Sequence, residues 1–306
     1  MKKFTRSCLI TGIVLCIIGG SAMAAGYAGG AWSEVTGKSS SLVGLGTTTV
    51  VTTKDSAKTE SLTLDPGEYS YLQFQLSSED ITIRPSQDGQ IHIRYQDHEH
   101  VRYQTRTEAP AAGGSGSTYV FSRMELTSSF NFGFHFDTDE GIQVSVPQGM
   151  GVSVSTVSGE IELSDISLKN LDVTTSSGDI DLSGVTVTGD LLLSSISGEL
   201  ELSSVTVSGS AKLETTSGEM EWKSCQLAAA SLYTVSGDIS GSVQAAGDLS
   251  LDTTSGDIDL DLRGSPAHRQ GSVSAVSGDV KMEGMDPDGE YTIDVDTVSG
   301  DVTIRH

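Results

Sequence analysis

A serine-glycine-acid tripeptide returns eight times in the second half of this 306-residue chain and limits its fold more than any other feature. Its glycines are Gly159, Gly178, Gly198, Gly218, Gly237, Gly256, Gly278 and Gly300. Successive glycines lie 19 to 22 residues apart. A period this regular is typical of proteins in which one structural unit stacks on the next. We therefore expect one coil of about 20 residues per repeat.

The residues after each glycine alternate between carboxylates and large aliphatic side chains, as in Glu160-Ile161-Glu162-Leu163. Alternation with a period of two indicates a short strand with one buried face. Further short apolar runs follow in most repeats, for example Val185-Thr186-Val187 and Leu191-Leu192-Leu193. The pattern predicts an all-β fold, a single-stranded β-solenoid of the β-helix-like kind. At each corner we expect the glycine to supply a positive φ and the preceding serine to bond local backbone.

The segment before the triplets keeps the strand pattern in a weaker form. Residues Ser77 to Ile83 look like a degenerate copy of the repeat. Phe130, Phe132, Phe134 and Phe136 alternate with polar residues, which predicts an apolar cap on the N-terminal end, with an exposed adhesive patch as the alternative. We divide the chain into a membrane anchor or signal peptide (1–33), a linker (34–59), a degenerate β-strand part with the cap (60–146) and the repeat solenoid (147–306).

The N-terminal segment directs the chain to or across a membrane. No charge occurs between Arg6 and Glu34, and a helix over residues 7–33 is long enough to span a bilayer. Under one interpretation it is a single-pass anchor with its basic N-terminus inside. Under the other it is a signal peptide cleaved after Ala22-Met23-Ala24. Both place the body outside the cytoplasm, membrane-anchored in the first case and secreted in the second.

Charge and cysteine content exclude several classes of protein. The net charge is -23, and residues 151–306 hold 26 acidic against 7 basic residues. A nucleic-acid binder needs a basic face, so that class is disfavoured. Only Cys225 lies beyond the apolar N-terminal segment, so no intramolecular disulfide crosslinks the body. We expect Cys225 to be a small buried core residue.

Several segments together resemble a known family. They are the basic-then-apolar N-terminus, the strand Ile81-Thr82-Ile83, the run Val144 to Gly149 and the following Val157 to Ile161. On these residues the chain resembles the bacterial putative-adhesin, β-strand-repeat family of unknown function, over most of residues 60–306. The resemblance implies the repeat architecture and makes a surface or envelope-stress role an expectation. It supplies no catalytic or binding residues to carry over.

The candidate binding site is a ladder of carboxylates, one from each triplet. Its members are Glu160, Asp179, Glu199, Glu219, Asp238, Asp257, Asp279 and Asp301. A second ladder two residues on contains Glu162, Asp181, Glu201, Glu221 and Asp259. Like charges stacked about 4.8 Å apart repel, so water and salt, bound cations or a cationic partner must screen them. We expect no metal site and no cofactor, with calcium as an alternative because oxygen ligands suit it.

Catalysis is not expected. Polysaccharide-active β-helices group paired carboxylates with a base in one cleft, whereas these acids repeat uniformly. We expect a non-catalytic, adhesin-like module of the cell surface or envelope. The alternatives are an envelope-stress component that binds cationic antimicrobial peptides or a membrane sensor protein and, after it, a glycan-active enzyme. The expected partner is an envelope or surface macromolecule. The last coil, ending at His306 without a cap, suggests end-to-end self-association.

Overall fold

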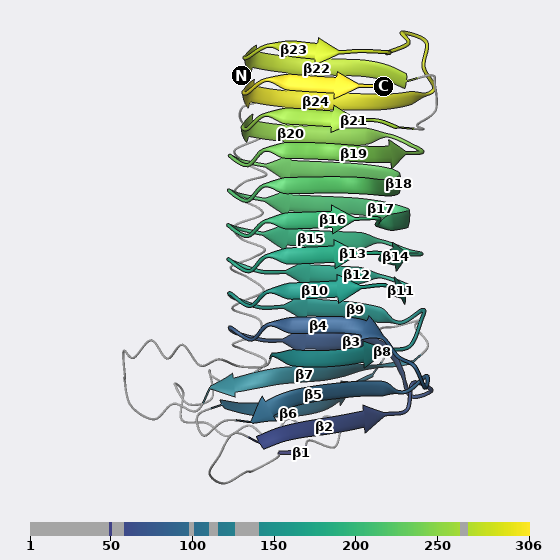
Figure 1. Cartoon of the computed structure of the whole chain (residues 1–306), viewed down its shortest axis with the longest axis vertical. Helices are drawn as coiled ribbons and strands as arrows, with labels where there is room; N and C mark the ends of the chain where they lie inside the picture. The colour runs from purple at the N-terminus through teal and green to yellow at the C-terminus, as the bar shows by residue number, and fades with distance from the viewer. Residues whose placement is uncertain (1–48, 51–57, 98–100, 110–115, 126–140, 264–268) are drawn as a thin grey trace, which may run out of the picture.

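The computed structural model describes residues 49–50, 58–97, 101–109, 116–125, 141–263 and 269–306. Their regular secondary structure is entirely β, in 25 strands joined into one hydrogen-bonded, largely parallel sheet. No helix within these ranges is long and apolar enough to cross a membrane. The N-terminal segment 1–33 and the run Phe130 to Phe136 lie outside the described residues. The chain is therefore an all-β, solenoid-like stack of coils (Figure 1).

Two long ladders of parallel strands run the length of the stack. The first consists of strands that follow a corner: β4 (Ile81–Pro85), β8 (Ile142–Val146), β10 (Ile161–Ser164), β13 (Ile180–Ser183), β16 (Leu200–Ser203), β18 (Met220–Thr234), β19 (Ile239–Ala245), β21 (Ile258–Asp261), β23 (Val280–Met282) and β25 (Val302–Arg305). The second precedes a corner: β3 (Tyr69–Gln75), β7 (Ser117–Glu125), β9 (Gly151–Ser155), β12 (Leu171–Thr174), β15 (Leu191–Ser195), β17 (Thr206–Thr215), β20 (Leu249–Ser255), β22 (Arg269–Ser277) and β24 (Tyr291–Ser299).

A short third ladder closes the middle coils. It contains β11 (Ser167–Leu168) and β14 (Thr186–Val187), and continues into the first residues of β17 and the middle of β18. Strand β18 is long because it turns through all three ladders without interruption. The three runs expected in each repeat are thus confirmed in the central coils.

The register between coils follows the sequence repeat. Ile161 pairs with Ile180, and Ile180 pairs with Leu200, so equivalent residues stack directly. Ile81 pairs with Ile161, which confirms that the segment around Ser77 to Ile83 is a degenerate copy of the repeat. Each coil therefore presents nearly the same surface to the coil above it and to the coil below it.

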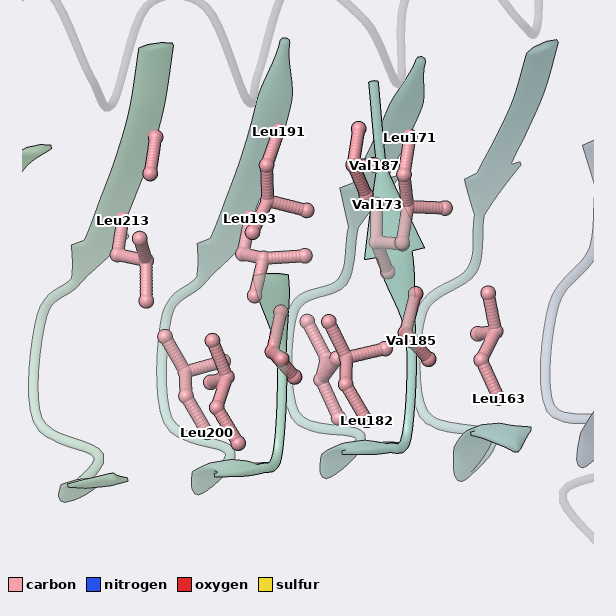
Figure 2. Packing of buried hydrophobic residues seen from close by; sticks show 14 of the residues in the cluster. Leu163, Leu171, Val173, Leu182, Val185, Val187, Leu191, Leu193, Leu200 and Leu213 are labelled. Atoms are coloured by element: carbon pink, nitrogen blue, oxygen red, sulfur yellow. The ribbon is translucent and has the colours of Figure 1, made fainter. Parts of the chain in front are cut away.

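The core is a set of aliphatic columns inside the stack. Leu163, Leu182 and Leu202 are fully buried, as are Val173 and Leu193 from the opposite ladder. Figure 2 shows the labelled leucines and valines of successive coils repeating along the stack. Each buried side chain of this size stabilises a fold by about 1.5–3 kcal/mol. Because every coil lends its neighbours the same columns, no single repeat needs a core of its own.

The triplet glycines are required by close stacking of the backbone. A Cβ on Gly178 would lie 2.0 Å from the carbonyl oxygen of Gly159, and one on Gly198 would lie 1.9 Å from that of Gly178. The expectation of a positive φ was wrong for the first six glycines; only Gly278 and Gly300 have one, at 113° and 142°. Positive φ occurs instead at the next corner, in a column that includes Asp165, Gly184, Ser204 and Ser224.

Hydroxyl groups complete the glycine corner, although not in the way the sequence suggested. The residue three before the glycine bonds the local backbone: the Gly178 amide donates to Thr175 Oγ1 at 3.0 Å, and the Gly198 amide donates to Ser195 Oγ at 2.8 Å. The serine next to the glycine bonds another coil, since Ser177 Oγ donates to the Val157 carbonyl at 3.2 Å. The full corner motif is therefore a buried Thr or Ser, two further residues, glycine and an acid.

The coil order is exchanged at both ends of the stack (Figure 1). At the C-terminal end, the last coil β24–β25 lies between β20–β21 and β22–β23. At the other end, the first coil β3–β4 lies between β9–β10 and β7–β8. The expectation that the chain ends on an open coil at His306 was therefore wrong. The outermost coil is β22–β23, and the C-terminal strands are held on both sides.

Antiparallel strands and aromatic rings close the N-terminal end. β5 (Ile91–Asp97) pairs antiparallel with β8 and with β2 (Lys58–Leu64); β6 (Val101–Glu108) pairs antiparallel with β7 and with β1 (Thr49–Val50). Beneath them Phe121 lies 4.9 Å from the Tyr103 ring and 5.2 Å from the Tyr95 ring, centroid to centroid. Aromatic residues therefore pack at this end of the core. The four phenylalanines expected to form the cap, at positions 130 to 136, lie outside the described residues.

The close approach at the corner leads to a first prediction. Gly178→Ala should lower the free energy of unfolding by about 1–3 kcal/mol, the usual cost of overpacking, because the Gly159 carbonyl cannot move without shifting its own coil. Ser176→Ala, two residues away in the same corner, should change it by less than about 0.5 kcal/mol. Denaturant unfolding of both variants measures this. Equal stability of Gly178→Ala and the wild type would contradict the close-stacking explanation.

Candidate functional site

The candidate site is the acidic face, which we define as the outward side of the first ladder from β10 to β18. The inward side of these strands carries the aliphatic columns, so alternation directs Glu160, Glu162 and their equivalents outward. In register, Glu162 pairs with Asp181 and Asp181 with Glu201. The structure thus brings both predicted acid ladders side by side on one face.

Four of the five aspartates of the first ladder have a structural role, which they share with Asp80 of the preceding coil. Asp179 Oδ1 accepts a hydrogen bond from the Glu199 amide at 2.8 Å, and Asp80 Oδ1 accepts one from the Glu160 amide at 2.9 Å. The same bond, to the backbone amide of the next coil in space, is made by three further aspartates: Asp238, Asp257 and Asp301. A charge-assisted bond to an otherwise unsatisfied corner amide holds neighbouring coils together.

The glutamates of the same ladder are left to face solvent. Glu160, Glu199 and Glu219, which we call the outer glutamates, make no equivalent bond to the next coil, and all three are exposed. Their side chain is one methylene longer than that of aspartate. Among the described residues, no Lys or Arg forms an ion pair with any member of the first ladder. The outer glutamates, together with Asp279 in the outermost coil, are therefore the carboxylates of this ladder that make no bond to a neighbouring coil and remain available to a ligand.

The second ladder is mostly neutralised by nearby bases. Lys223 Nζ lies 2.8 Å from Glu201 Oε1 and 3.2 Å from Glu221 Oε2. Glu162 lies 3.6 Å from Arg84 Nη2, and Asp259 pairs with Arg305. Exposed pairs such as these contribute only about 0–1 kcal/mol each, but they cancel negative charge locally. On the acidic face, the carboxylates that form no ion pair with a base are therefore the outer glutamates, Asp179 and Asp181.

The pKa values reflect this imbalance. Partial burial, followed by repulsion from Asp80, Asp179 and other acids, raises the pKa of Glu160 above its usual value. Partial burial, followed by repulsion from Glu201 and Glu162, raises the pKa of Asp181, with Lys223 acting in the opposite direction. A field that disfavours an added negative charge favours a bound cation.

No group of side chains suited to metal binding occurs within the described residues. No three His, Cys, Asp or Glu side chains there are placed to hold a metal ion, so the calcium alternative gains no site. Cys225 is buried, which confirms the expectation of a core cysteine, and burial raises the pKa of its thiol. A shallow groove of about 340 Å³ is lined by Ser210, Ala229, Ala230, Ser231, Asp248, Leu249, Ser250, Thr292 and Asp294.

The charged side chains of this groove are Asp248 and Asp294. Asp248 Oδ1 accepts the Thr292 amide at 2.8 Å, which gives it the same coil-joining role as the corner aspartates. The other lining residues are alanines, serines, Leu249 and Thr292, so no histidine, cysteine, lysine or arginine lines the groove.

One feature missed at the sequence level belongs to the N-terminal coil. Glu79, at the position of a triplet glycine, is buried and accepts the amides of Ser77 at 3.0 Å and Ser78 at 3.1 Å. Its carboxylate also pairs with Arg123 at 2.8 Å and accepts the Tyr103 hydroxyl at 3.2 Å. A buried ion pair with satisfied oxygens tethers the first coil to β6 and β7. Its only sequence signal was an acid in place of a glycine.

The fold and face together define a class: a solenoid-like β stack with one acidic side and no catalytic grouping among its described residues. The family model "Toastrack DUF4097" matches residues 69–305, so the chain belongs to this family. The expected kinship with bacterial adhesin-like repeat proteins is confirmed.

Solved structures resemble this chain at low sequence identity. A putative adhesin from Parabacteroides distasonis ATCC 8503 matches with a TM-score of 0.50 and 13% identity, over 81% of this chain and 97% of that one. A putative adhesin from Bacteroides fragilis NCTC 9343 matches with a TM-score of 0.39 and 13% identity, over 82% and 98%. A search of curated proteins found no match. At these identities the likeness concerns the fold alone.

The aspartate bond leads to a second prediction. Asp179→Ala should lower the free energy of unfolding by about 0.5–1.5 kcal/mol, because the Glu199 amide loses its acceptor. Asp179→Asn keeps an acceptor oxygen and should lose less. Glu199→Ala, in the same ladder but without this bond, serves as the matched control in chemical denaturation. A loss for Glu199→Ala as large as that for Asp179→Ala would count against the distinction.

The raised pKa values lead to a third prediction. The folded-state pKa of Glu160 and Asp181 exceeds the ordinary value. Between the ordinary and the raised pKa the folded chain therefore binds more protons than the unfolded chain, so the free energy of unfolding falls as pH rises through this range. Glu160→Gln with Asp181→Asn should remove this dependence and raise stability at pH 7 by about 0.2–1 kcal/mol.

Thermal unfolding between pH 4 and pH 8 at low salt measures the effect. Asp88→Asn is the control of opposite sign, since the amide of Gln90 and then His92 lower the pKa of Asp88 to about 2. That substitution should not raise stability at pH 7. A double variant that is less stable than the wild type at pH 7 would show that the acidic face is not under electrostatic strain.

Proposed function

We propose that this chain is a non-catalytic, adhesin-like interaction module of the cell surface or envelope, which binds cationic partners through its acidic face. The observation that carries the proposal is the set of outer glutamates, which form no ion pair with a base and lie in register on one face of the stacked coils. Each contact on such a row is weak, and affinity arises when several are made together. A surface with regularly spaced positive charge is the kind of partner that fits.

The proposed location follows from the N-terminal segment rather than from the described residues. An uncharged stretch over residues 7–33 places the body outside the cytoplasm, whether anchored or released. Family membership is compatible with this, since one protein of similar fold is described as a putative adhesin. A non-catalytic role is supported by the uniform spacing of the acids and by the burial of Cys225.

A second candidate is capture of cationic antimicrobial peptides, or contact with a membrane sensor, by an envelope-stress component. The observation that favours it is the raised pKa of Glu160 and Asp181, since bound positive charge relieves the same repulsion. The two candidates differ in valence. A short peptide covers few coils and binds one rod, whereas an extended surface engages the whole face.

A fourth prediction tests the acidic face. Cells that express the full chain with a C-terminal tag are allowed to bind poly-lysine-coated beads, and external protease on intact cells verifies that the tag is outside. Glu160→Gln, Glu199→Gln and Glu219→Gln together should weaken bead binding about tenfold, with each substitution costing roughly 0.2–1 kcal/mol. Deletion of residues 180–199, one coil in register, should weaken it in part.

The matched control neutralises three exposed glutamates elsewhere: Glu68, Glu108 and Glu290. It changes the net charge equally, so it separates the face from total charge. Binding should also fall as salt rises, because exposed charges are screened beyond about 8 Å at physiological ionic strength. If the control weakens binding as much as the triple variant, the acidic face is not the site. Complete loss from any single substitution would contradict multivalent binding.

A further inference from the structure

Within the described residues, the C-terminal end of the stack has an open strand edge. Among the described strands, β22 pairs only with β24, and β23 only with β25. Of the described coils, this one therefore has a neighbour on one side only. Val280 is 42% exposed, whereas Val302, its partner in β25, is fully buried. Val276 in β22 is 80% exposed. An exposed edge with apolar side chains favours pairing with another strand.

This end is held in a defined shape. Arg269, the first residue of β22, is fully buried and reaches past Tyr291 of the inserted coil, with its guanidinium 5.7 Å from the ring centroid. Its Nη1 donates to the Gly247 carbonyl at 2.9 Å, and its Nη2 donates to that of Ala245. The outermost coil is thereby fastened to the turn that lies beyond its neighbour. The edge is pre-organised, which lowers the entropic cost of pairing.

The backbone of β23 indicates which kind of partner can pair with this edge. The Glu283 amide donates to the Ile304 carbonyl at 2.9 Å, and the Asp279 carbonyl accepts the Val302 amide at 2.8 Å. Backbone groups of successive strand residues point to alternate sides, so those of Val280 and Met282 point away from β25. An extended strand is the occupant that satisfies such a row.

The charges of this edge are complementary to those of the same edge in a second copy. Lys281 Nζ lies 2.8 Å from Glu283 Oε1 within one copy, so the edge is locally neutral on a chain of net charge -23. Antiparallel pairing centred on Met282 sets Lys281 of each copy opposite Glu283 of the other. It also separates the two Asp279 carboxylates, which parallel stacking would superpose. Opposite charges directly across a strand pair stabilise it, and like charges destabilise it.

The two ends of the stack are unlike, which limits the assembly. The N-terminal end carries the antiparallel strands β2, β5 and β6 over an aromatic cluster, so it does not repeat the coil surface. We propose that two copies of this chain associate tail to tail, with β23 of one pairing antiparallel with β23 of the other. Such a two-fold contact uses the same patch on both copies and closes on itself, giving a dimer rather than a fibre.

Tail-to-tail pairing places the antiparallel strands β2, β5 and β6 of the two copies at opposite ends of a doubled rod. If the chain is displayed at the cell surface as proposed, the contact makes adhesion homophilic. That reading rests on the proposed surface location, whereas the association itself does not. A failure of the acidic-face test would leave this dimer untouched, and a failure here would leave the acidic face untouched.

The test measures the mass of the purified full chain in detergent by light scattering over a range of concentrations, with electron micrographs of the particles. The wild type should form dimers of about twice the rod length. Val276→Lys with Val280→Lys should weaken dimerisation at least about tenfold, since charge on an edge strand opposes pairing. Val157→Lys, a 53% exposed valine at a corner far from this end, should change it less than about twofold.

A charge exchange distinguishes specific pairing from a loss of folding. Lys281→Glu should weaken dimerisation by setting acids opposite each other, and Lys281→Glu with Glu283→Lys should restore it. A monomer at all concentrations would overturn the proposal. So would side-by-side particles, or a dimer indifferent to both edge variants. A single variant that the charge exchange fails to restore would equally contradict antiparallel pairing centred on Met282.

Discussion

The whole structure depends on how closely one coil approaches the next at the glycine corner. The carbonyl oxygen of each corner glycine lies where the Cβ of the next would be, at 1.8 to 2.2 Å for positions from Gly178 to Gly256. Only glycine fits, so the backbone itself sets the stacking distance. With the distance set, a threonine or serine hydroxyl inside the corner and an aspartate carboxylate outside it satisfy the amides that the turn leaves unpaired.

The acidic face follows from this arrangement. The position after the glycine must point outward, because the next residue enters the core. Aspartate there reaches the neighbouring amide, and glutamate there extends past it. A repeat that is copied for its corner chemistry therefore copies a column of carboxylates with it. In this chain the position holds aspartate in some repeats and glutamate in others. Four of the five aspartates join neighbouring coils, whereas the glutamates are available to a ligand.

Periodic features were predictable from the sequence. Features that depend on the order in which the coils stack, or on the length of one side chain, were not. The spacing of the triplets predicts the coils, and alternation predicts which residues are buried, as Leu163 and Leu182 show. The reason for the glycine was misassigned. A positive φ and a backbone too close for a Cβ both require glycine, so the sequence cannot tell the two requirements apart. The different roles of Asp179 and Glu199 depend on one methylene group. Predicting them requires the distance between neighbouring coils, which the sequence does not give.

The exchanged coil order was hidden because neighbouring coils offer nearly the same stacking surface. A weak signal was present, however. The inward positions of β24 are Ile293 and Val295, whereas the corresponding positions of β22 are Gly271 and Val273. The larger aliphatic residues take the place that is covered on both sides, where burial is worth more. Hydrophobicity compared between repeats, rather than within each, would have indicated which coil lies outermost.

The distribution of charge makes the sides and the ends of the rod suited to different contacts. Packing two acidic faces together is unfavourable, because the outer glutamates would meet like charges that no base pairs with. The end coil is different, since Lys281 and Glu283 cancel and Val276 and Val280 are exposed. Repulsion on the acidic face therefore disfavours contact between copies on that side, whereas the end coil carries no such penalty. The acidic face is thereby kept open for a partner of opposite charge.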